Sequence, residues 1–244
     1  MNCENKVAIV TGAADGGMGR SIALTLAREG ARVVVNYRTS QAAAEAIVDH
    51  ITSQGGTAIA VQADVFDAAG CKALVEATVA QFERVDILIV GPGGGWHPEG
   101  IDRLAPDGAQ QDLTQETAPL YHLMPLVLPG MYERAWGRLI GIATHPDKRS
   151  PAYAYNVGKA ARTHALLLAH EQAWPHGVTV NVVAPGLVAA ILRLEDAVEH
   201  CDHGPAWQER ADISPQDVAE GVALLCSESG RFISGCVLPY LFRG

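Results

Sequence analysis

One pair of residues in this sequence has the types and the spacing that proton transfer needs. Tyr155 and Lys159 stand four residues apart, and this spacing places two side chains on one face of a helix. A phenol with a pKa near ~10 is a poor base at neutral pH, but a neighbouring ammonium group stabilises its phenolate. Tyr155 could then exchange a proton with an alcohol or carbonyl oxygen as a general acid/base. The alternative is an exposed tyrosine and lysine that merely share a helix.

A second set of residues suits the binding of a phosphate group. Gly12, Gly17 and Gly19 follow a short apolar run and precede a segment of helical period. Glycines at a strand-to-helix turn let the backbone approach a pyrophosphate, which then rests on the helix N-terminus. The plain alternative is a tight turn without a ligand. Asp15 lies inside this loop, and its carboxylate would repel a pyrophosphate unless it points outward.

Short apolar runs alternate along the chain with longer segments of helical period, one of which predicts a helix near Gln115–Arg134. Seven runs predict strands, namely Val7–Val10, Val33–Val35, Ala58–Val61, Ile87–Val90, Leu139–Ala143, Val178–Ala184 and Val237–Tyr240. Because these runs are rich in Val, Ile and Leu without polar alternation, they predict a parallel sheet with helices on both faces. Right-handed crossovers make this an α/β fold with a doubly wound parallel sheet, a Rossmann fold of three α/β/α layers.

The sequence predicts a single domain over residues 1–244. No internal repeat, linker or low-complexity segment interrupts the alternation. The longest stretch without a clear period is about 187–212, directly after the sixth predicted strand. Long loops at the carboxyl ends of parallel strands often cover a ligand crevice, so we expect this stretch to form a lid over the substrate.

Four motifs in this order resemble the short-chain dehydrogenase/reductase family. They are Thr11-Gly12 with the glycine loop, Asp64-Val65, Tyr155-Asn156-Val157-Gly158-Lys159, and Asn181-Val182-Val183-Ala184-Pro185-Gly186. The resemblance runs from Lys6 to Gly235 and implies an oxidoreductase that interconverts a secondary alcohol and a ketone by hydride transfer. It further implies that Tyr155 is the acid/base and that Lys159 lowers its pKa and holds the nicotinamide ribose. A 3-hydroxyacyl or 3-oxoacyl thioester is one substrate of this class.

The resemblance also assigns further site residues. Thr144 aligns with the family's catalytic serine, and its hydroxyl could donate to a substrate carbonyl; alternatively it only ends a strand. Glu116 stands where a helix asparagine joins the family's proton relay. The implied dinucleotide contacts are Gly12, Gly17, Gly19, Arg38, Asp64, Val65, Gly91, Lys159, Pro185, Gly186 and Val188.

The residues after the second predicted strand favour NADP over NAD. A Rossmann protein that selects NAD usually has an acidic residue there, which binds the ribose 2′-hydroxyl. This chain has Arg38 instead and no Asp or Glu before Glu45. A guanidinium group suits a 2′-phosphate, although Arg38 could also be an ordinary solvated loop residue.

The chain departs from the family's pattern mainly around the dinucleotide. The glycine loop is one residue longer, and the usual Asn-Asn-Ala-Gly after the fourth strand is Val90-Gly91-Pro92-Gly93. Ala190 replaces a threonine that meets the nicotinamide carboxamide. We therefore expect weak or absent dinucleotide binding by the chain alone. Besides an active enzyme with a reshaped site, the sequence allows a cofactor-free subunit of a hetero-oligomeric dehydrogenase. One such dehydrogenase acts on hydroxybenzylsuccinyl-CoA-type thioesters.

The amino-acid composition limits the expected cellular location of the protein and the classes of partner that it can bind. The net charge of −9 and the lack of a basic run argue against nucleic acid. No apolar run is long enough for a membrane span, and five scattered cysteines without a CxxC pair suit the cytoplasm. The run His200-Cys201-Asp202-His203 has metal-ligand residue types but no second cluster, so we predict no metal site. Apolar stretches near Leu120–Val127 and Leu166–Leu168 predict a homo-tetramer or a hetero-oligomer with a paralogue.

Overall fold

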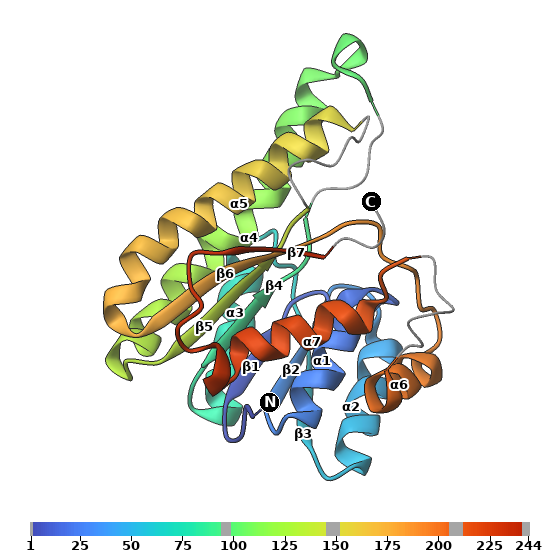
Figure 1. The fold of residues 1–244 in the computed structure, drawn as a ribbon, viewed down its shortest axis with the longest axis vertical. Coiled ribbons are helices and arrows are strands. Elements are labelled where there is room, and N and C mark those ends of the chain that lie inside the picture. Colours follow the sequence, from blue (N-terminus) through green and yellow to red (C-terminus); the bar gives the residue numbers. More distant parts are fainter. Residues whose placement is uncertain (1, 94–98, 145–151, 205–211, 241–244) are drawn as a thin grey trace.

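The computed structural model describes residues 2–93, 99–144, 152–204 and 212–240. A single parallel sheet of seven strands forms the centre, in the order β3-β2-β1-β4-β5-β6-β7 (Figure 1). The strands are β1 (Val7–Val10), β2 (Arg32–Tyr37), β3 (Thr57–Gln62), β4 (Ile87–Val90), β5 (Gly137–Ile142), β6 (Val178–Pro185) and β7 (Val237–Tyr240). The predicted doubly wound sheet is thus confirmed, with strand ends shifted by at most two residues.

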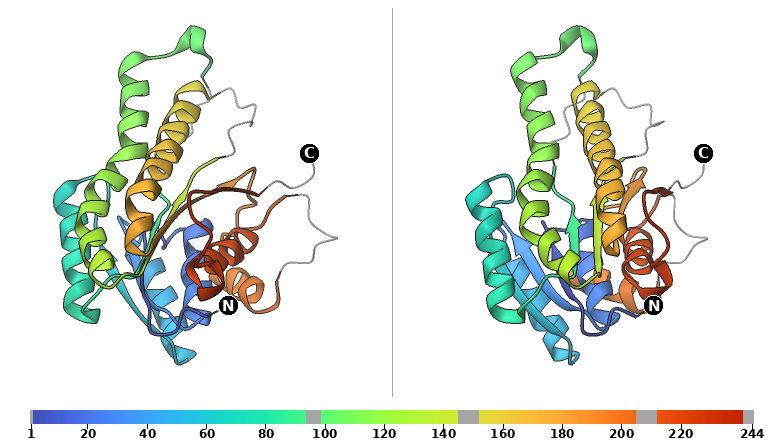
Figure 2. Two further views of the ribbon diagram at one scale, coloured as in Figure 1. Left: turned by 60° about the vertical axis from the view of Figure 1, so that its left-hand side comes forward. Right: turned by 90° about the vertical axis from the view of Figure 1, so that its left-hand side faces the viewer.

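Helices cover both faces of this sheet, as the turned views show (Figure 2). One face carries α1 (Met18–Arg28), α2 (Gln41–Ser53), α6 (Leu194–His203) and α7 (Pro215–Cys226). The other carries α3 (Ala68–Phe82), α4 (Pro106–Glu133) and α5 (Tyr153–Ala173). Residues such as Ala8 and Val10 face the first layer, whereas Val7 and Ile9 face the second. Strands that are buried on both sides need apolar residues at every position, which explains their unbroken apolar runs.

Two helices differ from the sequence-based expectation. The stretch 187–212, expected to be irregular, contains α6, whose buried positions are Ala197 and Cys201. Two small residues four apart are a weak periodic signal, which explains why the helix was missed. Helix α4 begins at Pro106 rather than near Gln115, because proline suits the first turn of a helix.

The carboxyl ends of the central strands define where a ligand can bind. Strand order reverses between β1 and β4, and in such sheets the crevice outside the carboxyl ends at this reversal binds the ligand. Helices α4 and α5 pack side by side and extend beyond the sheet (Figures 1 and 2). Within the described ranges, no helix has the length and apolar character that crossing a membrane would require.

Candidate active site

The glycine loop joins β1 to α1 with its backbone open to a ligand. Gly17 occupies the N-cap position of α1 in extended conformation, with no side chain capping the helix. A Cβ atom at Gly17 would meet nothing within 4 Å, whereas one at Gly19 would lie 2.5 Å from the carbonyl oxygen of Gly12. The loop therefore needs glycine at position 19 for packing. The first turn of α1 is left with N–H groups that suit an anion.

A buried asparagine, Asn36, holds this loop in place. Its side-chain oxygen accepts a hydrogen bond of 3.1 Å from the Gly12 amide. Its amide nitrogen donates to the carbonyls of Val61 and Ala63 at 3.3 and 3.1 Å. Asn36 thus connects the ends of β1, β2 and β3. Sequence analysis missed this role; the only available signal was a polar residue at the end of an apolar strand.

The acidic residue within the lengthened loop bonds to a neighbouring segment. Asp15 accepts a hydrogen bond of 2.6 Å from the hydroxyl of Ser40, which directly precedes α2. A cavity of about 230 Å³ opens beside this pair. Four predicted dinucleotide contacts line it, namely Gly12, Arg38, Asp64 and Val65. An open glycine turn beside a cavity with an exposed arginine fits the nucleotide end of a dinucleotide.

Apart from Lys159 on α5, the remaining predicted dinucleotide contacts lie at or just after the carboxyl ends of β4 and β6. The Gly91 amide donates a 3.1 Å hydrogen bond to the Thr11 hydroxyl, which links the ends of β4 and β1. Pro185 ends β6, and the Gly186 amide donates to the Tyr240 carbonyl at 2.8 Å. Val188 pairs with Ile213 in an isolated parallel bridge.

The predicted proton-transfer residues meet on the facing sides of α4 and α5. The Lys159 ammonium lies 5.2 Å from the centre of the Tyr155 ring and 3.1 Å from a carboxylate oxygen of Glu116. The second carboxylate oxygen lies 3.0 Å from the Nε atom of Arg162. Glu116 and Arg162 are fully buried, and Lys159 is 7% exposed. The structure therefore joins three predicted residues to a fourth, Arg162, that sequence analysis did not single out.

Burial and this ion cluster shift the pKa values of Tyr155 and Lys159. Burial first, and then the negative charge of Glu116, raises the pKa of Tyr155 to about 12, against the opposing effect of Arg162. Burial and then the positive charge of Arg162 lower the pKa of Lys159 to about 8, although Glu116 acts in the opposite direction. We expected Lys159 to lower the pKa of Tyr155. The Lys159 ammonium instead pairs with Glu116, and burial therefore makes the pKa of the Tyr155 phenol rise.

The expectations for Thr144 and for the lid concern segments that adjoin residues outside the described ranges. Thr144 follows β5 and is half-buried, directly before residues 145–151, which lie outside the described part. Of the expected lid, residues 205–211 also lie outside it. The described part approaches the glycine loop, where Arg20 donates to the carbonyls of Ile191 and Leu192. From there α6 packs along α1, so this part lies against Arg20 and Gly16 at one edge of the loop, while Gly17 stays open.

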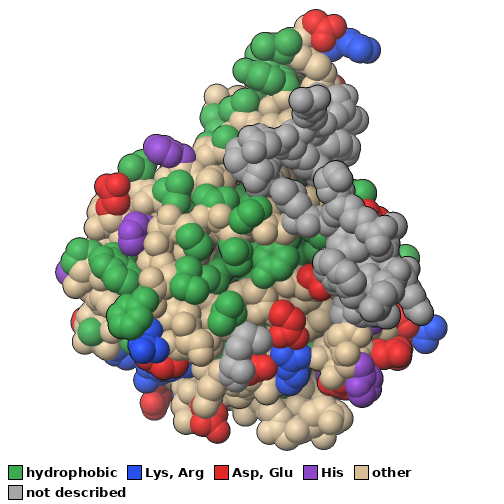
Figure 3. Space-filling model, viewed as in Figure 1, with side chains coloured by type: hydrophobic (Ala, Val, Ile, Leu, Met, Phe, Trp, Pro, Cys, Tyr) green, Lys and Arg blue, Asp and Glu red, His purple; other side chains and the backbone are tan. Residues whose placement is uncertain are grey.

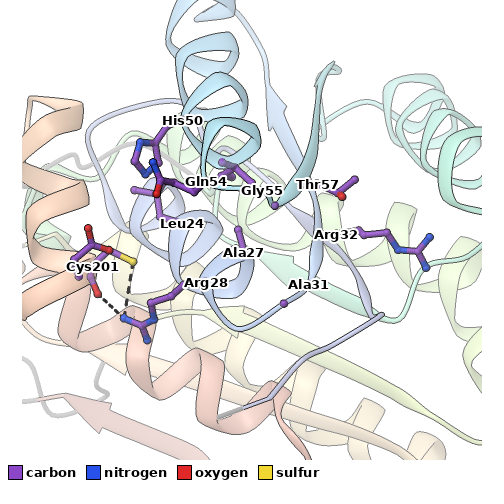
Figure 4. Close-up of a pocket in the computed structure, with 14 residues that line it drawn as sticks. Leu24, Ala27, Arg28, Ala31, Arg32, His50, Gln54, Gly55, Thr57 and Cys201 are labelled. Atoms are coloured by element: carbon purple, nitrogen blue, oxygen red, sulfur yellow. Dashed lines mark hydrogen bonds between the residues drawn. The ribbon is translucent and has the colours of Figure 1, made fainter.

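A larger cavity lies away from these residues. Its volume is about 440 Å³, and it is lined by the C-terminal parts of α1, α2 and α6 and by the starts of β2 and β3. Figure 4 shows Arg28 in its wall bonded to Cys201, while Glu220 accepts two further bonds from Arg28 at 2.9 Å. The cavity adjoins the amino ends of the strands, opposite the edge where such sheets bind ligands. In the described ranges, no group of three metal-ligating side chains comes together.

Comparison with known proteins finds relatives that match almost the whole chain. The family whose model matches residues 6–197 is described as short chain dehydrogenase. An uncharacterized oxidoreductase of Methylorubrum extorquens is 36% identical, with 96% of both chains covered. The 3-oxoacyl-(acyl-carrier-protein) reductase of Staphylococcus aureus is 31% identical, with 94% of both chains covered.

A solved structure resembles the chain over almost its full length. It is a 7 alpha-hydroxysteroid dehydrogenase in complex with NADH and 7-oxo glycochenodeoxycholic acid, which superposes with a TM-score of 0.84 at 28% identity. The match covers 98% of this chain and 93% of that one.

The lowered pKa of Lys159 predicts a specific dependence of stability on pH. Between a folded value of about 8 and the ordinary value of 10.5, the unfolded chain binds more protons at this residue. The contribution of Lys159 to the free energy of unfolding therefore rises with pH in this window, by up to about 1 kcal/mol per pH unit. Lys159→Met should remove this rise when urea unfolding is compared at about pH 8 and about pH 9.5. Lys72→Met, at an exposed lysine of α3, is the control and should leave the slope unchanged; an unchanged slope in Lys159→Met would contradict the prediction.

Proposed function

Because the chain belongs to the short-chain dehydrogenase/reductase family, we propose that it is an NAD(P)-dependent oxidoreductase interconverting a secondary alcohol and a ketone. The observation that carries this proposal is the approach of Tyr155 and Lys159 on α5, beside an open glycine loop at the switch point of the sheet. Proton-transfer and phosphate-binding groups thus converge at one edge. The relatives named as a hydroxysteroid dehydrogenase and a 3-oxoacyl reductase support this substrate class, within which a 3-oxoacyl or 3-hydroxyacyl thioester is our specific proposal.

The protonation state of Tyr155 suits proton donation at neutral pH. With a pKa of about 12, Tyr155 is a neutral phenol there and is ready to donate its proton to a carbonyl oxygen. A nicotinamide dinucleotide held by the glycine loop and Lys159 would supply the hydride for the carbonyl carbon. The phenol then regains a proton from solvent, and the product is the neutral alcohol. Thr144, at the end of β5, is proposed to donate a hydrogen bond to the same oxygen.

The roles proposed for the cations follow from their charge. Lys159, with a pKa of about 8, is mostly protonated at neutral pH and can donate to ribose hydroxyl groups. The exposed guanidinium of Arg38 in the wall of the 230 Å³ cavity supports a 2′-phosphate and therefore NADP. The structural neighbour bound to NADH supports a nicotinamide dinucleotide in general, and NAD is the alternative.

The catalytic role of Tyr155 predicts a large loss in one variant. Tyr155→Phe removes the oxygen that exchanges the proton and should lower kcat by about 10²–10⁴-fold. Reduction of a 3-oxoacyl thioester, followed by NADPH absorbance, is the assay. Tyr153→Phe is the control because Tyr153 begins the same helix and is 43% exposed. If Tyr155→Phe retains most of the activity, Tyr155 is not the acid.

The proposed contact between Arg38 and the 2′-phosphate predicts an effect on NADPH binding that is absent for NADH. Arg38→Ala should weaken NADPH binding by about 5–100-fold, the equivalent of one charge-assisted interaction, and leave NADH binding unchanged. Calorimetric titration of the pure chain with each dinucleotide measures this. Arg103→Ala, at an exposed arginine near α4, is the control. Equal affinities for both dinucleotides, unchanged in Arg38→Ala, would show that Arg38 does not read the phosphate.

The same titration separates the two functions that the sequence allows. Because of the loop insertion with Asp15 and of Ala190, we expect dissociation constants in the high micromolar range or weaker. Low-micromolar binding by the chain alone would contradict this expectation and favour a self-sufficient enzyme. The alternative is a cofactor-free subunit of a hetero-oligomeric dehydrogenase. The absence of measurable binding, together with a co-purifying homologue that binds the dinucleotide, would favour that alternative.

Two separate apolar surfaces support a tetrameric assembly. The groove between α4 and α5 is lined by residues such as Tyr121 and Leu168, which are 59% and 48% exposed. A second apolar area lies over α5, β7 and α7 (Figure 3). Phe232, which precedes β7 in the chain, is 76% exposed. Monomers rarely leave large apolar patches in water, and two self-complementary interfaces generate a tetramer.

Light scattering on the purified chain should therefore give the mass of a tetramer, as a homo-oligomer or together with a paralogue. Leu168→Glu, which places a charge in the α4–α5 groove, should reduce this mass. Val79→Glu alters an exposed apolar residue of α3 and should not. A monomer at micromolar concentration would contradict the proposal.

A further inference from the structure

A fully buried arginine, Arg162, connects four segments around the candidate active site. It follows Lys159 by three residues on α5 and is 0% exposed. Its Nε donates to the main-chain carbonyl of Glu116 at 2.8 Å, and Nη1 donates to the carbonyls of Gly91 and Ile142 at 3.0 Å. Nη2 donates to the carbonyl of Pro92. One guanidinium thus ties α5 to α4 and to the segments at the carboxyl ends of β4 and β5.

The same guanidinium shares a carboxylate with Lys159. The Arg162 Nε atom lies 3.0 Å from one oxygen of Glu116, and the Lys159 Nζ atom lies 3.1 Å from the other. A buried carboxylate requires a compensating charge, and a buried arginine requires one as well. With two cations around one anion, the cluster keeps a net positive charge when all three groups are ionised. A single pair of Lys159 and Glu116 would instead be neutral.

Two glycines provide the space for this arrangement. A Cβ atom at Gly158 would lie 2.8 Å from the Glu116 Cγ atom, and one at Gly93 would collide with the carboxylate. Gly93 belongs to the segment that replaces the usual asparagine-rich one, and Glu116 itself replaces the helix asparagine. These departures therefore form one connected structural unit around Arg162 rather than separate losses.

We propose that Arg162 is a positioning residue: it holds Glu116 and the ends of β4 and β5 in place, and its charge offsets that of Glu116 so that Lys159 stays available to a ligand. This inference rests on the proposed function. The charged groups that act on Lys159 are Arg162 on α5 and Glu116 on α4, and the Tyr155 ring lies 5.2 Å from its ammonium. Asp112, one turn before Glu116 on α4, is also buried. From β4 and β5 the cluster meets main-chain carbonyls.

The electrostatic part of the proposal predicts opposite effects of two substitutions. Arg162→Met removes a positive charge next to Lys159 and should raise its pKa by about one unit. Glu116→Gln removes a negative charge and should lower the same pKa by about one unit. The double variant Glu116→Gln/Arg162→Met should return it close to the starting value. The measurement is an NMR pH titration of lysine labelled with carbon-13, in which the Lys159 signal is assigned by its absence in Lys159→Met.

Two further variants separate charge from packing. Arg162→Lys keeps the charge but loses the planar group, so it should preserve the Lys159 titration while loosening the end of β4. Arg138→Met removes another buried arginine, which stacks on Trp136 at the start of β5, and should leave the Lys159 titration unchanged. If Arg162→Met does not fold, the comparison of Glu116→Gln with the double variant still measures the effect of the Arg162 charge on the pKa of Lys159. Shifts in the same direction for both single changes, or no shifts, would overturn the proposal.

Activity is a second and independent readout. The pH at which 3-oxoacyl thioester reduction becomes half-maximal should move in opposite directions in Arg162→Met and Glu116→Gln, and return in the double variant. If the NMR shifts occur but no variant, including the original chain, shows turnover, the proposed function fails while the role of Arg162 in the cluster stands. If turnover occurs without the opposite NMR shifts, the proposed activity stands and the inference about Arg162 is wrong.

Discussion

A carboxylate that is fully removed from water requires positive charge and donors at close range, and in this chain Glu116 imposes that requirement. Lys159 and Arg162 supply the positive charge from α5, one close to each oxygen. The register of α4 against α5 therefore has an electrostatic determinant in addition to apolar packing. Since Tyr155 lies one turn before Lys159, the same ion cluster sets the electrostatic surroundings of the phenol.

The main chain at the carboxyl edge of the sheet is held by buried side chains in two places. Asn36 bonds to the glycine loop and to the end of β3, while Arg162 bonds to carbonyls after β4 and β5. Peptide groups at strand ends leave the ladder and need other partners. Polar side chains that supply them hold the loops in position without closing the edge to a ligand.

The departures from the family's pattern have a common structural origin at this edge. The loss of amide side chains after β4 coincides with Arg162, which donates to the carbonyls of Gly91 and Pro92. Glycines at positions 93 and 158 leave space for the larger acidic side chain at position 116. Asp15, in the lengthened glycine loop, has its own partner in Ser40. The side chains that differ from the family's pattern at this edge therefore have partners within the fold.

The sequence by itself determined the class of fold, because strands buried on both faces must be apolar throughout and such runs are visible without coordinates. It also predicted Tyr155, Lys159 and the glycine turn as site residues, since their chemistry depends on local spacing. It did not identify α6, whose buried face consists of two small residues, or the start of α4. Only the tertiary structure brought Arg162 to Glu116, 46 positions away along the chain. It also decided the direction in which the pKa of Tyr155 moves, because burial and charge at a site depend on which segments of the chain meet there.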